Sequence, residues 1–151
     1  MDWFVVFLAT KLYLVVVVAG LLVFLYGTRV GRKNLFRVSL LALPTAFILS
    51  RLANFLVESP RPFVDGHMSA LIEHAPDNGF PSDHTLLTVT VGAIIYTQNK
   101  LVGSILILLG ILVGIGRVLS GVHHAIDIVG SITIAFVATY LAVLILRRWQ
   151  I

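Results

Sequence analysis

Residues 12–26 read LYLVVVVAGLLVFLY, a run of apolar side chains without a charge. The run lies inside a longer apolar segment, from about Trp3 to Tyr26, and a helix needs about 20 mostly apolar residues to cross a bilayer. The segment is too long for the apolar part of a signal peptide, and it follows Asp2 rather than a basic residue, so we expect no cleavage. It predicts a first membrane-spanning helix.

Four further apolar segments follow this one, at about 35–57 (with a kink expected at Pro44), 82–97, 101–119 and 123–146. The composition is 58% hydrophobic and 12% charged, which leaves too little polar surface for a soluble domain. The sequence therefore predicts an all-α fold, a polytopic transmembrane helix bundle with about five spanning helices. We expect residues 1–151 to form a single domain.

One long polar connection joins the second and third segments, at residues 58–81. Its middle, from about Met68 to His74, is expected to form a short helix on the membrane surface. The chain has no cysteine, which excludes disulfides and cysteine-ligated metal sites.

Acidic and basic residues separate onto opposite sides of the predicted bundle. Seven basic residues share one side without any acid: Arg29, Arg32, Lys33, Arg37, Lys100, Arg147 and Arg148. Every acid lies on the other side: Asp2, Glu58, Asp65, Glu73, Asp77, Asp83 and Asp127. Because Lys and Arg in short loops mark the cytoplasm, the C-terminus is predicted to be cytoplasmic and the long loop to face outward. The net charge of +4 is then a topology signal, and no nucleic-acid partner is expected.

Three polar motifs fall on the outward side: RPF at 61–63, PSDH at 81–84 and GRVLSGVHHAID at 116–127. They are distant in sequence, but the predicted topology brings all three to one membrane face. Ser82 or Asp83 is a suitable N-cap, and a helix N-terminus binds phosphate through its free amides. The guanidinium groups of Arg61 and Arg117 match phosphate oxygens. The sequence predicts one phosphate-binding site.

Histidines supply the chemistry in this site. His123 and Asp127 are spaced i, i+4, which on a helix lets the carboxylate fix the imidazole tautomer. We expect His123 to attack phosphorus and His84 to protonate the leaving oxygen. The pattern indicates phosphoryl transfer through a histidine nucleophile.

Each motif also has a simpler interpretation. A single interfacial Arg often extends to lipid phosphates, and PSDH alone could only cap a helix. His84, His123, His124 and Asp127 could instead ligate zinc. Two arginines beside a dication are electrostatically unfavourable, so no metal and no cofactor is expected.

The three motifs resemble those of the type-2 phosphatidic acid phosphatase superfamily, K-x6-RP, PSGH and SR-x5-H-x3-D. Here the first is NFLVESPRP, ending at Arg61-Pro62, the second is PSDH, and the third keeps the spacing from Arg117 to His123 to Asp127. Three positions depart from the family: Asn54 replaces Lys, Gly116 replaces Ser, and Asp83 replaces Gly. PDNGFPSDHT, at 76–85, is most similar to the BcrC-type undecaprenyl-diphosphate phosphatases.

The resemblance implies a metal-independent hydrolysis of undecaprenyl diphosphate to the monophosphate, through a phosphohistidine, on the outer face of the inner membrane. The lipid substrate and membrane lipids are the implied partners. Phosphatidic acid, phosphatidylglycerophosphate and lipid A phosphatases of the same superfamily remain alternatives, as does a non-catalytic lipid-phosphate-binding protein. Family members usually have six spanning helices, so with five we expect that one has been lost at the N-terminus.

The missing Lys raises one further hypothesis. Arg51 lies one helical turn before Asn54, and we expect it to supply part of the lost positive charge. Lys11 is a second candidate. The alternative is that Arg51 only forms an ion pair with Glu58, seven residues further on the same helix face.

Overall fold

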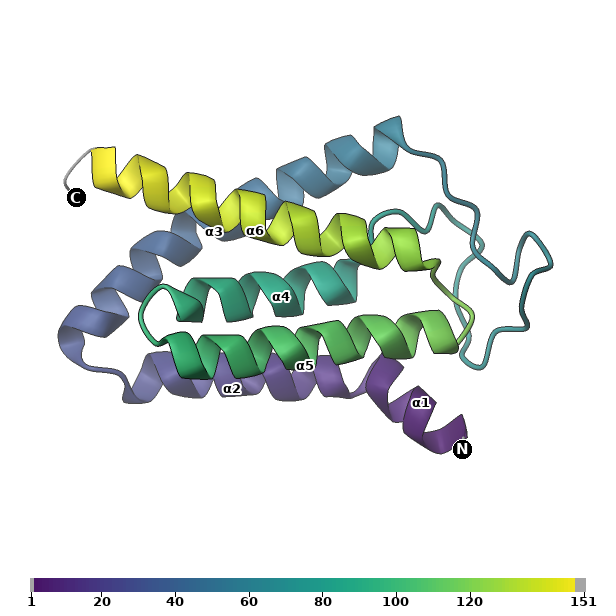
Figure 1. Ribbon diagram of the computed structural model, residues 1–151, viewed down its shortest axis with the longest axis horizontal. Helices are drawn as coiled ribbons and strands as arrows, with labels where there is room; N and C mark the ends of the chain where they lie inside the picture. The colour runs from purple at the N-terminus through teal and green to yellow at the C-terminus, as the bar shows by residue number, and fades with distance from the viewer. Residues whose placement is uncertain (1, 149–151) are drawn as a thin grey trace.

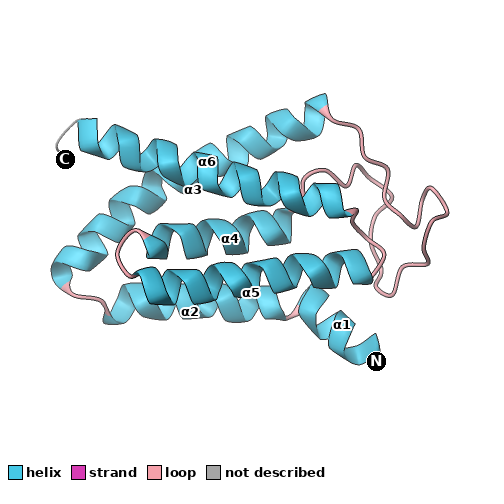
Figure 2. Cartoon of the chain, in the orientation of Figure 1, coloured by secondary structure: helices cyan, strands magenta, loops and turns pink. Residues whose placement is uncertain are grey.

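The computed structural model describes residues 2–148, which form helices joined by turns and one long loop (Figure 1). No strand occurs in these residues (Figure 2), so the all-α prediction is confirmed for residues 2–148. The helices are α1 (Asp2–Thr10), α2 (Leu12–Tyr26), α3 (Arg29–Leu56), α4 (Asp83–Tyr96), α5 (Lys100–Leu119) and α6 (Ala125–Arg148).

The first apolar segment is two helices rather than one. α1 and α2 meet at Lys11 with their axes bent by 41°. The Thr10 hydroxyl donates to the Val6 carbonyl at 2.6 Å, a local bond that bends helices. Gly116 of α5 packs on α1, where an added Cβ would lie 2.6 Å from Leu8 Cβ. The bend therefore lays α1 against the end of α5 that carries Arg117.

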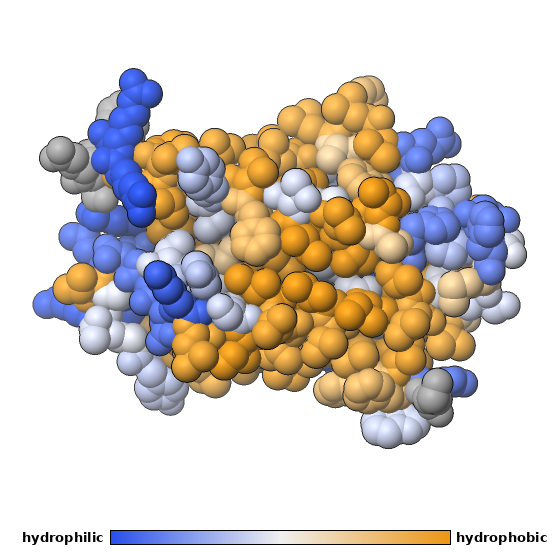
Figure 3. Space-filling model, viewed as in Figure 1, coloured by the Kyte–Doolittle hydropathy of each residue, from blue (hydrophilic) through white to orange (hydrophobic). Residues whose placement is uncertain are grey.

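Within residues 2–148, three helices are long and apolar enough to cross a membrane: α3, α5 and α6. A fourth span exists if α1 and α2 count as one bent span. The remaining predicted span, the third at 82–97, corresponds to α4, which has only 14 residues and at 1.5 Å per residue is shorter than a hydrocarbon core of about 30 Å. On the face shown in Figure 3, apolar side chains form a band between two polar ends, as expected of a multi-pass membrane protein.

α4 lies at the centre of the bundle and contacts α2, α3, α5 and α6. Most of its side chains are buried, so it is surrounded by helices rather than by lipid. Gly110 and Gly114 of α5 permit the close approach, since a Cβ at Gly114 would lie 2.5 Å from Ile128 of α6 and 3.0 Å from Thr85 of α4. The small-residue pair thus brings three helices together.

α3 continues through Pro44 without interruption, and Figure 1 shows it bending part-way along its length, as expected for a proline within a helix. Its C-terminal end leads into the long loop at the end of the bundle where α4 begins.

The expected surface helix at residues 68–74 is wrong, because this part of the loop has no helical structure. The Leu71 amide donates to the Ser120 carbonyl at 2.9 Å instead of to a carbonyl within the loop. Gly121, with a φ of 74°, lies against the Ser69 carbonyl, where an added Cβ would be 2.8 Å away. The loop is therefore held in irregular, non-helical form against the connection between α5 and α6.

Candidate active site

A polar cavity of about 220 Å³ lies at the loop end of the bundle. All three sequence motifs contribute residues to this cavity. The structure therefore brings the motifs together, as predicted. Its lining comprises Arg51, Asn54, Arg61, His74, Asp77, Asn78, Pro81, Asp83, His84, Arg117 and His123.

His123 and Asp127 are both buried, with 3% and 0% of their surface exposed. His123 Nδ1 lies 3.2 Å from Asp127 Oδ2, and the Arg61 Nη1 donor lies 3.2 Å from His123 Nε2. Since a guanidinium can only donate, Nε2 must accept, which leaves the proton on Nδ1 facing the carboxylate. Nε2 therefore carries the unprotonated electron pair that a nucleophile needs, and in the absence of substrate this pair accepts from Arg61.

His123 lies in the turn before α6 and not on the helix, which begins at Ala125. The expected contact between His123 and Asp127 forms nevertheless, because the Asp127 side chain points toward the N-terminal end of α6, where His123 lies. Its Oδ2 also accepts from the His124 amide at 2.9 Å, and its Oδ1 accepts from Ser59 Oγ at 2.9 Å. Asp127 thus joins the helix start, the loop and the imidazole.

The two motif arginines are buried, and they differ in their partners. Arg61 is fixed by Asp77 Oδ1 at 2.8 Å and the Val122 carbonyl at 2.7 Å. Arg117 makes one long contact, 3.5 Å from Nη1 to the Ala9 carbonyl, while its Nε and Nη2 have no partner within residues 2–148. A buried cation without an anion is costly, so Arg117 is suited to receive a negatively charged ligand.

The N-terminus of α4 reaches the cavity as expected. Ser82 is the N-cap residue, but its side chain makes no capping bond and instead accepts from Thr85 Oγ1 at 3.2 Å. His84 lines the cavity, with its ring edge-on to Tyr13 of α2 at a centroid distance of 4.6 Å. α2 thus positions a side chain from the second motif.

Arg51 forms an ion pair with Asp83, 2.6 Å from Nη2 to Oδ1. The alternative pairing with Glu58 is therefore wrong: the end of α4 places Asp83 within reach of α3. Both side chains are partly exposed, at 44% and 69%. Lys11, at the α1–α2 bend, is not among the residues that line the cavity.

Asn54, where the family has Lys, has a structural contact. Its Nδ2 donates to the Phe80 carbonyl at 2.7 Å. Asn78 was not predicted from the sequence, yet its side chain accepts from the Ser59 and Phe80 amides and donates to the Asn54 and Val57 carbonyls. These two asparagines hold the ends of the loop together beside PSDH.

His74 is a second residue that sequence reasoning missed. It lines the cavity, and its ring centroid is 6.2 Å from that of His123. Burial lowers its pKa below the ordinary 6.5, and the charges of Arg61 and Arg117 lower it further, against an opposing hydrogen bond to the Ala75 carbonyl. Its position in a loop without a motif gave no signal beyond its residue type.

The pKa values of two ionisable groups beside Arg61, His123 and Asp77, are also shifted. Burial lowers the pKa of His123, although the hydrogen bond to Asp127 opposes the shift, so the imidazole favours its neutral form. Burial acts to raise the pKa of Asp77, but the hydrogen bond and charge of Arg61 outweigh it and hold that pKa below its usual 3.8.

The proposed zinc ligands do not converge. His124 turns to the loop, with Nε2 3.1 Å from the Pro60 carbonyl and 3.2 Å from Asp65 Oδ2. Within residues 2–148, no group of three or more His, Asp or Glu side chains is placed to share a metal.

Comparison with known families gives a match to the PAP2 superfamily over residues 37–151, which include all three motifs. The chain belongs to the PAP2 superfamily. The resemblance drawn from the motifs is thereby confirmed, and the chain is a membrane phosphatase of this family.

The chain is 28% identical to the undecaprenyl-diphosphatase BcrC of Bacillus subtilis (strain 168), over 93% of its own length and 72% of that protein. It is 36% identical to the bacitracin transport permease protein BcrC of Bacillus licheniformis, over 72% of its length and 54% of that protein. The putative undecaprenyl-diphosphatase YbjG of Escherichia coli (strain K12) is 28% identical, over 96% and 72%.

Among solved structures, the fold is similar to that of Aquifex aeolicus LpxE, with a TM-score of 0.76. The similarity covers 94% of this chain and 84% of LpxE. At 22% sequence identity it shows a shared fold.

Proposed function

We propose that this chain, as a single phosphatase domain over residues 1–151, hydrolyses undecaprenyl diphosphate to undecaprenyl phosphate on the extracytoplasmic face of the inner membrane. Two of its relatives are named for this activity. The observation that carries the proposal is the unprotonated His123 Nε2, held by Arg61, in one cavity with a buried Arg117 whose Nε and Nη2 have no partner within residues 2–148.

In the first step, His123 Nε2 attacks the terminal phosphorus, and the bond from phosphorus to the bridging oxygen breaks. The lipid monophosphate leaves with a proton from His84. Asp127 stabilises the positive charge that develops on the imidazole. Arg61, Arg117 and the amides after Ser82 hold the three equatorial oxygens, where charge accumulates.

In the second step, a water molecule attacks the phosphohistidine. His84, now neutral, accepts a proton from this water, the bond from phosphorus to Nε2 breaks, and inorganic phosphate leaves. The protein returns to its starting protonation state. Neither step needs a metal, since fixed cations and helix amides supply the positive charge.

The ion pair between Arg51 and Asp83 is suited to a substrate that carries two phosphates. Asp83 places a carboxylate beside an anion site, where it repels substrate unless it is neutralised, and Arg51 neutralises it at 2.6 Å. We propose that Arg51 moves from Asp83 to the second phosphate when the substrate binds. In this way it replaces the cation missing at Asn54, whose side chain is engaged with Phe80.

We infer the orientation from charge. The cavity lies at the end of the bundle that carries the acids, and the seven basic residues without acidic neighbours lie at the other end, which we assign to the cytoplasm. An outward-facing cavity at headgroup depth meets the phosphates of a polyprenyl diphosphate carrier.

Phosphate release by the purified chain tests the function, with undecaprenyl diphosphate, phosphatidic acid, phosphatidylglycerophosphate and lipid A as substrates, each with and without EDTA. We expect fastest release from undecaprenyl diphosphate and no effect of EDTA. Preference for a phosphomonoester would assign the chain to another lipid phosphatase of the superfamily. Binding without release from any substrate would make it a lipid-phosphate-binding protein.

A further inference from the structure

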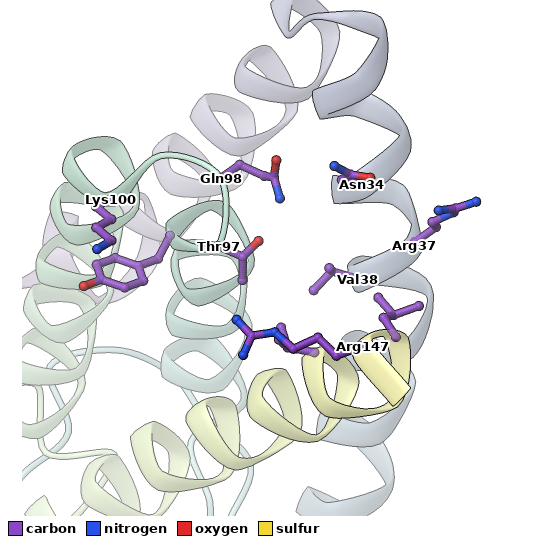
Figure 4. Close-up of a pocket in the computed structure, with 10 residues that line it drawn as sticks. Asn34, Arg37, Val38, Thr97, Gln98, Lys100 and Arg147 are labelled. Atoms are coloured by element: carbon purple, nitrogen blue, oxygen red, sulfur yellow. The ribbon is translucent and has the colours of Figure 1, made fainter. Parts of the chain in front are cut away.

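A second cavity, larger than the catalytic one, lies at the opposite end of the bundle, with a volume of about 590 Å³. It is enclosed by the N-terminal half of α3, the connection between α4 and α5, and the C-terminal end of α6 (Figure 4). None of its lining residues belongs to the three motifs, so the proposed chemistry does not use it.

The charge on this cavity is positive and uncompensated. Arg37, Lys100 and Arg147 line it, and no acidic side chain does. Within residues 2–148, none of the three forms an ion pair, because the acids of the chain lie toward the catalytic end. A concave site lined by one sign of charge attracts ions of the other sign.

The side chains are arranged as donors around an opening. In Figure 4, Arg147 extends from α6 into the space below Thr97, while Asn34 of α3 and Gln98 face each other across the gap. Arg37 points away from the cavity, so its charge contributes from the rim. Arg147 with the Asn34 and Gln98 amides forms the part of the site that can hydrogen-bond an oxyanion.

The rest of the lining indicates a lipid rather than a soluble anion. Val38, Val143 and Leu146 give the cavity an apolar wall, which a small hydrated anion would not need. The elements that line the cavity meet at one end of the bundle (Figure 1), and on the face shown in Figure 3 this end is polar and borders the apolar band, as expected at the depth of phospholipid phosphates. Basic pockets between helices at this depth are suited to anionic headgroups.

We propose that this cavity binds the headgroup of an anionic phospholipid from the adjacent leaflet, with Arg147, Asn34 and Gln98 contacting its phosphate. The bound lipid connects three elements that otherwise meet only through packing: α3, the α4–α5 connection and α6. Because a ligand that binds only the folded state stabilises it, anionic lipid should raise the melting temperature. The proposal depends on membrane insertion and not on the substrate of the catalytic site.

The test measures the melting temperature of the full chain in a neutral detergent, against increasing phosphatidylglycerol, phosphatidylcholine or inorganic phosphate. Phosphatidylglycerol carries its phosphate as a diester without a terminal phosphoryl group, so the phosphatase site does not consume it. Arg147→Gln removes the central donor. Arg148→Gln is the matched control, because it removes the same charge one residue further on from a side chain that does not line the cavity.

We expect phosphatidylglycerol, but not phosphatidylcholine or inorganic phosphate, to stabilise the protein. Arg147→Gln should weaken the apparent affinity about tenfold or more, the effect of losing charge-assisted hydrogen bonds, and Arg148→Gln should leave it nearly unchanged. Asn34→Leu and Gln98→Leu, which keep the net charge, should each weaken binding, and they test the site if Arg147→Gln does not fold.

Three results would overturn the proposal. Equal weakening by Arg147→Gln and Arg148→Gln would show general attraction to the basic end. Equal stabilisation by phosphatidylcholine would remove the requirement for an anion. Stabilisation by inorganic phosphate that matches phosphatidylglycerol and is lost in Arg147→Gln would assign the cavity to a free anion.

Discussion

His123 and His124 are neighbours in the chain with different surroundings. His123 is buried between Asp127 and Arg61 in the cavity, whereas His124 contacts Pro60 and Asp65 of the loop. Of these two histidines, only His123 lines the cavity, so in the proposed mechanism only His123 of the pair can reach a substrate there.

His123→Ala should therefore lower kcat by about a thousandfold or more, as loss of a nucleophile does. It should also abolish an acid-labile phosphoprotein trapped from radiolabelled substrate. His124→Ala should retain most of the turnover, and circular dichroism should show both variants folded. Similar losses of turnover in the two variants would contradict the assignment.

The acid limb of the pH profile is the second test at this scale. His123 must be neutral to attack, and burial lowers its pKa below 6.5, so activity should persist as pH falls through 6.5 and decline only below it. Asp127→Asn removes the interactions that raise this pKa, so the limb should move to lower pH while kcat falls. The measurement is kcat/KM between about pH 4.5 and 8.

His74→Asn is the control for that profile, because His74 is a second histidine in the cavity with a lowered pKa. We expect the acid limb to remain in place in this variant. If the acid limb shifted in His74→Asn and stayed in place in Asp127→Asn, the group that titrates would be His74 and not His123.

Arg51 gives the third prediction. If it binds the second phosphate, Arg51→Gln should lower kcat/KM for a diphosphate about tenfold or more, and Asn54→Lys should restore part of it. Asp83→Asn removes the competing carboxylate and should lower KM. If Arg51 only pairs with Asp83, Arg51→Gln and Asp83→Asn should lose similar stability, and their turnover per folded molecule should stay near normal.

At the scale of elements, the site depends on how closely α4, α5 and α6 pack. A Cβ at Gly114 would meet Ile128, which follows Asp127, and Thr85, which donates to Ser82. The small residue on α5 therefore sets the distance between the second and third motifs.

Gly114→Ala should lower both stability and turnover. The gain in helix propensity, at most about 1 kcal/mol, is smaller than the overpacking cost of about 1–3 kcal/mol. Thermal unfolding and turnover per folded molecule measure the effect, with Ile115→Ala on the exposed face as the control. An unchanged melting temperature together with full turnover would show that the contact is not needed.

At the scale of the whole molecule, the orientation in the membrane can be tested directly because the chain has no native cysteine. Met68→Cys in the loop should react with an impermeant maleimide in intact cells. Lys33→Cys, at the basic end, should react only after permeabilisation. The reverse labelling would place the catalytic cavity on the cytoplasmic side.

Much of the site could be predicted from the sequence because its motifs are short and local. The i, i+4 spacing of His123 and Asp127 predicted their contact, although His123 lies before the helix and the contact depends on Asp127 folding back. Arg61, Arg117 and His84 also line the predicted cavity. The membrane fold follows from apolar segments whose lengths are properties of the chain itself.

The sequence by itself determined the membrane class, the all-α fold and the three motifs, since each depends on composition or on spacing within a few residues. Only the tertiary structure decided the bend at Lys11, the short α4, the non-helical loop, the Arg51–Asp83 pair and the place of His74 in the cavity. The physical reason is that these features depend on partners distant in the chain. Asp83 lies 32 residues from Arg51, and Leu71 of the loop donates to the Ser120 carbonyl at the end of α5 instead of closing a helical turn.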